Sequence, residues 1–347
     1  MIVTDNQAVS LHTATGVQLA QFGPGEQGAL KWTRSLREVS TCELSVPEPD
    51  LLADVYPWAH WLSVWDLDTP ALLWTGPVLK AVASRTSLDI SARDIGALLA
   101  RTRCPLTKRW DSSDPSVIAR ALWMAMIEHH GLKTTPVSRL DPEGDPFDFT
   151  ATANESMLDA VMNDLVGLGL RWSVVAGVPV LGPMPAAPLA ALSEADLIGD
   201  GLTVVRDGSE TANDVMLRAA DTVAQTTVPL ANLALQSIVS SDSMFGISNV
   251  ERALRQYARH TAQIRDSLTL PGGVEMHPDA PVSIDELVPS ARFTIDARGL
   301  RSLMELDSVE VTRGGGSVAV SATFTTVNEL PELATSGDSG LGSIGGL

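Results

Sequence analysis

Two adjacent histidines are the residues with the clearest capacity for metal chemistry. His129 and His130 precede an acidic segment in which Asp141, Glu143 and Asp145 could supply oxygen ligands, and imidazole with carboxylate is a common donor set for zinc. Neighbouring side chains on a helix point about 100° apart, however, and histidines in a last helical turn are favourable against the helix dipole without any metal. We therefore expect no metal site here.

Paired carboxylates are a second possible source of chemistry, because glycosidases need two acids at a suitable separation. Asp66 and Asp68 would share one face of a strand, but their place before Pro70 is typical of the entry to a turn. The glycines at 314–316 lack the Lys and the Ser or Thr of a phosphate-binding loop, and no Gly-x-Ser-x-Gly or His-Glu-x-x-His pattern occurs. The sequence thus predicts no catalytic, cofactor-binding or metal-binding residues, no cofactor, and no enzymatic activity.

The chain has eight tryptophans and two tyrosines, and Trp58, Trp61, Trp65 and Trp74 lie close together in the sequence. Exposed indoles could stack on the sugars of a cell wall, whereas buried ones would pack a core or a contact between subunits. Trp61 and Trp65 flank an alternating strand, which favours core and interface.

Composition limits the classes of protein that this chain can be. Its 347 residues are 44% hydrophobic, enough for a substantial core, and its formal charge of −18 opposes general binding to nucleic acid. Cys42 and Cys104 are too few for a disulfide scaffold or a four-cysteine zinc site, so we expect two buried, reduced thiols. The start of the chain lacks the pattern of a signal peptide, and no apolar run is long enough to cross a membrane.

The elements that would position these side chains fall into a strand-rich block, a helical block and a second strand-rich block. Apolar and polar residues alternate up to about residue 91, as in Cys42–Val46, and again over 293–324. Pro77 suggests an edge or a bulge in the first block, and the three glycines at 314–316 suggest a turn in the second.

Helical periods occupy the middle of the chain. We predict a helix over 93–101, a longer helix capped by Asp114 that ends near Gly131, and a further capped helix that begins at Asn154. A hairpin turning at Ala176-Gly177 follows. Further segments are a surface loop with an extended end over 133–149, a linker at 183–188, a third helix over about 248–266, and a flexible Gly/Ser-rich end over 335–347.

Three segments carry a resemblance to a known family. Trp74, Gly76 and Val78 form an aromatic, Gly, branched signature on a strand before the helix RDIGALLAR; GLRWSVVAGVPVLGP follows a helix at 169–183; and SDSMFGISNVERAL occupies 241–254, with Phe245 where Tyr is more usual. With the order of elements over 1–328, these segments resemble the tail hub, or baseplate hub, family of long-tailed phages, especially minor tail proteins of siphophages that infect actinobacteria.

The expected fold class is α+β, with two small antiparallel β-barrel-like domains and intervening helical and α+β segments, as in phage tail hubs. The expected domains are a first barrel-like tube domain at 1–105, a helical and hairpin domain at 106–183, a linker and strand-rich segment at 184–240, a helix with a second barrel-like domain at 241–330, and a flexible tail at 331–347.

The resemblance implies a structural role in the virion, at the tail tip, after assembly in the host cytoplasm. A homotrimer with two barrels in each chain would convert the six-fold symmetry of a tail tube to three-fold symmetry and continue the DNA channel. The implied partners are the distal tail protein ring, the tape measure protein, and downstream spike or fibre proteins; DNA would pass through without specific binding. The alternatives are a tail-associated protein that binds the cell wall or degrades peptidoglycan, and a hub of a phage-derived injection machine.

Overall fold

The computed structural model describes residues 2, 6–23, 28–142, 144, 146–199, 202–209, 211–219, 223–230, 232–241, 251, 254–255, 258, 261–262, 265–270 and 273–327. The chain divides into two compact units, which are 1–203 with 269–326 (unit 1) and 204–268 with 327–347 (unit 2). Among the described helices, none is both long and apolar enough to cross a membrane.

The first half of unit 1 is a set of antiparallel strands, as the alternating pattern predicts. In one of them Cys42, Leu44 and Val46 are buried while Glu43 is exposed, so one face of the strand packs on the core. The strands are β1 (Gln7–Thr13), β2 (Gln18–Phe22), β3 (Ala29–Ser35), β4 (Thr41–Val46), β5 (His60–Asp66), β6 (Ala71–Ala83) and β7 (Leu88–Arg93), with 3-10 helices η1 (Pro49–Asp54) and η2 (Ile95–Arg101).

The predicted irregularity near Pro77 is a bulge in β6. The register of β6 against β7 shifts between Val78 and Lys80. Just before it, Gly76 is required by a close backbone approach, because a Cβ atom there would lie 1.9 Å from the carbonyl oxygen of Arg93. The bulge and the glycine together let β6 bend between β5 and β7.

The second strand-rich block of unit 1 contains a long hairpin. Residues Gly315 and Gly316, both at positive φ, make the turn predicted from the glycine run. The strands are β13 (Ala190–Ser193), β14 (Leu197–Ile198), β20 (Val274–Met276), β21 (Arg292–Ala297), β22 (Leu300–Gly314) and β23 (Ser317–Thr326), with the short η3 (Glu194–Asp196).

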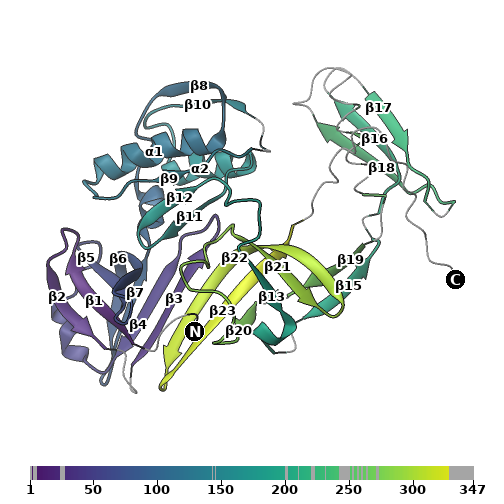
Figure 1. Ribbon diagram of the computed structural model, residues 1–347. Helices are drawn as coiled ribbons and strands as arrows, with labels where there is room; N and C mark the ends of the chain where they lie inside the picture. Colours follow the sequence, from purple (N-terminus) through teal and green to yellow (C-terminus); the bar gives the residue numbers. More distant parts are fainter. Residues whose placement is uncertain are drawn as a thin grey trace. The chain divides into compact units, whose positions relative to one another are not determined.

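The two blocks are joined along β3 and β22, which pair antiparallel from Leu30–Arg313 to Ser35–Ser308. Within the described residues of unit 1, this contact creates one 13-stranded sheet whose main path is β14-β20-β23-β22-β3-β4-β7-β6-β5-β1-β2. Figure 1 shows this curled sheet with the long strands of both blocks side by side. The fold is thus mostly β with few helices, and a pair of separate barrels stays a prediction.

A smaller layer with its own core completes unit 1. Asp114 accepts a hydrogen bond from the Ser116 N–H at 2.7 Å, which confirms the predicted cap, and Ala176 and Gly177 turn the predicted hairpin at positive φ. The layer contains β8 (Lys108–Ser113), α1 (Pro115–His129), β9 (Val137–Ser138), β10 (Phe147–Ala151), α2 (Leu158–Gly167), β11 (Trp172–Val175) and β12 (Val178–Leu181).

The predicted cap of the second helix is wrong. Asn154 has a positive φ of 63°, and the N-cap residue is Met157, which offers no side-chain hydrogen bond. Asparagine is one of the residues that tolerate the left-handed region, so Asn154 serves the turn before the helix. Residues 183–188, predicted to be a linker, contain no helix or strand and lie inside unit 1.

Unit 2 contains a small sheet in which β16 (Asp214–Ala219) pairs antiparallel with β17 (Val223–Thr227) and parallel with β18 (Gln236–Ser241). The strands β15 (Thr203–Asp207) and β19 (Arg265–Thr269) pair with each other. A helix is predicted over about 248–266, and the described residues 251, 254, 255, 258 and 261 are helical. The predicted end is too late, because β19 begins at Arg265. The predicted flexible end at 335–347 lies outside the described residues.

Candidate functional site

The histidine pair at the end of α1 makes contacts within the protein. The rings of His129 and His130 stand edge to face with centroids 4.9 Å apart, and His130 Nε2 lies 2.8 Å from Thr102 Oγ1. Burial, with a smaller contribution from His129, lowers the pKa of His130. Among the described residues no three His, Cys, Asp or Glu side chains gather as metal ligands would, and Glu143 and Asp145 fall outside that set.

Asp66 and Asp68 belong to a turn, as predicted. The buried carboxylate of Asp66 accepts hydrogen bonds from the backbone N–H groups of Asp68 and Thr69 at 2.9 and 3.3 Å. Asp68 accepts a further hydrogen bond from the Asn6 side chain at 2.8 Å. These contacts fix the connection between β5 and β6.

The four clustered tryptophans divide between the core and the surface. Trp74 is 2% exposed, and Trp61 is partly buried against the core of the layer that contains α1 and α2. Both positions agree with the expected role of these tryptophans in packing. Trp58 and Trp65 are 39% and 38% exposed, however. The guanidinium of Arg101 lies 5.9 Å from the Trp58 ring, whereas Trp65 lines a cavity.

That cavity, of about 420 Å³, lies on the face of β2, β1, β5 and β6 that points away from the core. These four strands are hydrogen-bonded neighbours in the order β2, β1, β5, β6 at one end of the sheet (Figure 1). The lining residues of the cavity recur at a spacing of two on β1 and β5, as one face of a strand demands. On β2 and β6 the spacing is three, and both strands pair with a register shift there. The polar and aromatic lining residues are Ser10, His12, Gln18, Gln21, Ser63, Trp65 and Thr75.

A chain of hydrogen bonds fixes the floor of the cavity. His12 Nδ1 lies 2.8 Å from the Thr13 carbonyl oxygen, which can only accept, so this nitrogen carries a hydrogen. In the neutral imidazole Nε2 then accepts from Ser63 Oγ at 2.7 Å, and Ser63 Oγ lies 2.7 Å from Thr75 Oγ1. The indole N–H of Trp65 donates to Ser10 Oγ at 3.1 Å. Sequence patterns did not reveal this group, because its members come from three strands.

Asp94 is a buried carboxyl group that the sequence patterns above did not predict. It accepts hydrogen bonds at 2.7 Å from the backbone N–H groups of Ser40 and Gly96, and thereby ties the β3–β4 turn to η2. Burial raises its pKa to about 7, against the lowering effect of these hydrogen bonds. Asp94 comes just before the helical pattern at 95–101, and this position could have predicted its role as a cap.

Arg34 is a second buried charge outside the predictions. Its Nη1 donates to the Ile284 carbonyl at 2.6 Å, and its Nη2 donates to the Leu73 carbonyl at 3.1 Å. Burial lowers its pKa to about 10, so the guanidinium stays charged at neutral pH. Arg34 shares the inward face of β3 with Leu30 and Trp32. A charged residue in this alternating apolar pattern could have predicted a buried arginine.

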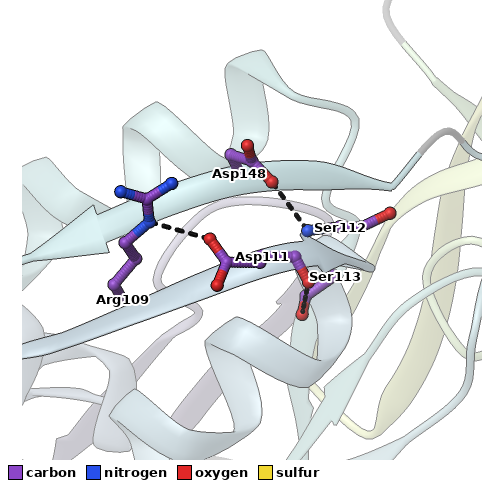
Figure 2. Close-up of polar contacts among 5 residues, drawn as sticks. All are labelled: Arg109, Asp111, Ser112, Ser113 and Asp148. Atoms are coloured by element: carbon purple, nitrogen blue, oxygen red, sulfur yellow. Dashed lines mark hydrogen bonds and ion pairs between the residues drawn. The ribbon is translucent and has the colours of Figure 1, made fainter.

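The tip of the β8–β10 ribbon presents exposed charges, which Figure 2 shows. Arg109 Nε lies 2.7 Å from an oxygen of Asp111, and both side chains are largely exposed. Asp148 accepts a hydrogen bond from the Ser112 N–H at 2.7 Å, where Ser112 has a positive φ of 46°. The acids at this tip are thus engaged in an ion pair and in a strained turn.

No family model matches the sequence, and no curated protein matches it in sequence. Solved structures do. A tail protein from Neisseria meningitidis MC58 is 13% identical with a TM-score of 0.62, over 94% of this chain and 98% of that one. The 43 kDa tail protein of prophage MuSo2 from Shewanella oneidensis is 12% identical with a TM-score of 0.59, over 92% and 98%.

A third solved structure is the prophage tail protein gp18 from Listeria monocytogenes EGD-e, which is 11% identical with a TM-score of 0.54, over 93% of this chain and 94% of that one. This chain has the fold of these tail proteins. At such low identities the shared property is the fold, and it extends over nearly the full length of each chain.

Proposed function

We propose that this chain is a structural protein of a bacteriophage tail, and that it forms the hub at the distal end. The observation that carries the proposal is the likeness in fold to three tail proteins, each over at least 92% of this chain. A hub of this kind performs no catalytic step, so we also propose that the chain is not an enzyme.

The proposed assembly is a homotrimeric ring that converts six-fold tube symmetry to three-fold symmetry and continues the DNA channel. Two strand-rich blocks in each chain would offer six similar surfaces to the tube above. The formal charge of −18 on each chain supports a channel that repels DNA in transit. The proposed contacts are the distal tail ring and tape measure protein on one side, and spike or fibre proteins on the other.

Cryo-electron microscopy of intact tails tests the hub proposal directly. We expect three copies of the chain in a ring at the tip of the tail, in a siphophage of actinobacteria or in a related injection machine. Six copies along the tube, or copies on peripheral fibres, would overturn the proposal. A neutral or basic channel surface would overturn the channel argument alone.

The enzymatic alternative has its own test, because degradation of peptidoglycan needs no assembled tail. Purified chain is applied to a gel that contains bacterial cell walls, with lysozyme as the positive control. We expect no cleared zone from the chain. A cleared zone that persists through repurification would contradict the proposal that the chain is not an enzyme.

A further inference from the structure

We propose that the cavity on β2, β1, β5 and β6 is a binding site for a neutral saccharide. This inference goes beyond the proposed hub function and concerns the chain before any assembly. It depends on the fixed indole of Trp65, on the uncharged polar lining, and on the size of the cavity.

Trp65 provides an apolar platform that is open to solvent and held in one orientation. Trp65 is 38% exposed, and its indole N–H group donates to Ser10 Oγ on the neighbouring strand at 3.1 Å. Ala8, which lies directly opposite Trp65 in the β1–β5 register, has only a methyl side chain and leaves room beside the indole. The C–H face of a sugar ring is apolar while its rim carries hydroxyls, so it stacks on a fixed indole.

His12 is the one ionisable side chain in the described lining, and both of its ring nitrogens already contact protein oxygens, although the chain as a whole is strongly charged. No Asp, Glu, Lys or Arg lines the cavity, in a chain in which 19% of residues are charged. A charged ligand would therefore lose its hydration without a charged partner, which is costly. This argument disfavours phosphates and charged peptides and favours a ligand whose polar groups are hydroxyls or amides.

Side-chain amides stand at the rim where such hydroxyls would lie. Gln18 and Gln21 on β2 are exposed, and Gln18 Nε2 donates to Gln21 Oε1 at 3.3 Å. That contact uses one donor and one acceptor site, and each amide offers two N–H groups and one carbonyl. The amides can therefore donate to and accept from vicinal hydroxyls.

The dimensions suit one or two sugar rings on a rigid base. Small-molecule sites usually have volumes of roughly 300–1,000 Å³, and this cavity has about 420 Å³. The linked side chains His12, Ser63 and Thr75 hold its floor, and its walls are strands of the main sheet. A site on paired strands keeps its geometry when empty, which lowers the entropic cost of binding.

Saturation-transfer NMR on the full-length chain tests the proposal with three probes. The neutral probes are maltotriose and triacetylchitotriose, and the anionic probe is glucose 6-phosphate. We expect saturation transfer to at least one neutral probe, with a dissociation constant in the millimolar range, and none to glucose 6-phosphate. The replacement Trp65→Ala should weaken binding about tenfold or more, and Gln21→Ala should weaken it by a smaller factor.

Trp58→Ala is the matched control, because Trp58 is equally exposed and does not line the cavity. Binding to this variant should equal binding to the unaltered chain. If Trp65→Ala fails to fold, Trp65→Phe and Gln21→Ala carry the comparison. Absence of transfer to both neutral probes, preference for the anionic probe, or equal weakening by Trp58→Ala would each overturn the proposal. None of these outcomes affects the hub assignment, whose test counts copies in the tail.

Discussion

Trp32 in β3 lies directly opposite Val311 in β22, although 279 positions of the sequence separate them. Both side chains are fully buried. Trp32 also lies opposite Cys42 in β4, so one indole packs where the two strand-rich blocks meet. This contact makes the folding of the amino-terminal block depend on residues near the carboxyl end.

Removal of this indole should therefore destabilise both blocks together. Truncation of a buried tryptophan, as in Trp32→Ala, costs about 3–5 kcal/mol through lost packing and a residual cavity. We expect a single earlier transition in urea, followed by far-ultraviolet circular dichroism. Trp58→Ala serves as the control and should cost less than Trp32→Ala, because Trp58 is 39% exposed. Two well-separated transitions in Trp32→Ala would show that the blocks fold independently.

The buried guanidinium of Arg34 should not be replaceable by lysine. Arg34 spans from the Leu73 carbonyl in β6 to the Ile284 carbonyl in the second block, and an ammonium group cannot reach two such acceptors in the same fixed geometry. We expect Arg34→Lys to lower the free energy of unfolding by more than about 2 kcal/mol. Thermal and urea unfolding measure the loss, and the exposed Arg109→Lys is the control. Equal stability of the two variants would contradict the bridging role.

Asp94 should give the unfolding free energy a measurable dependence on pH. Its pKa in the folded protein is raised to about 7 from an ordinary value of 3.8, so between these values the folded state holds a proton that the unfolded chain releases. The unfolding free energy therefore falls as pH rises through this window, by at most about 1.4 kcal/mol per pH unit.

The measurement compares the unaltered chain with Asp94→Asn in urea at several pH values from 4 to 8. The stability of the unaltered chain relative to the variant should decrease from about pH 4 to about pH 7 and then level off. A flat profile over the same window would mean that the two N–H donors outweigh burial and lower the pKa, because the pH dependence would then lie below about pH 4.

A methyl group at position 76 should disturb the bulge in β6. The Cβ of Gly76→Ala would lie 1.9 Å from the Arg93 carbonyl oxygen, so two strands would have to separate. We expect a loss of about 1–3 kcal/mol or more, as for other overpacked sites. Gly131→Ala is a comparison of backbone strain alone, since Gly131 has a positive φ and nothing near its Cβ position. A smaller loss at 76 than at 131 would contradict the close approach.

Local signals explain which elements the sequence could predict. Asp114 before Pro115, and Ala176-Gly177 between alternating strands, act through neighbouring residues, and the structure contains the capped helix and the hairpin. The cap predicted at Asn154 was wrong because asparagine suits both a helix cap and a left-handed turn, and here it occupies the turn. The β3–β22 pairing, and the cavity built on the four strands β2, β1, β5 and β6, depend on contacts between distant residues that periodicity does not encode.

The chain leaves unit 1 at Thr203 and re-enters it at Thr269, where the two hydroxyl oxygens are 2.7 Å apart. An insertion whose ends meet can be lengthened, shortened or exchanged while the surrounding strands keep their places, since closing a longer loop adds little entropic cost. Residues 204–268 therefore form an insertion that can be replaced as a whole. Evolution could graft a different module there to fit a new neighbour, and the same junction is the place at which an engineer could insert a reporter domain.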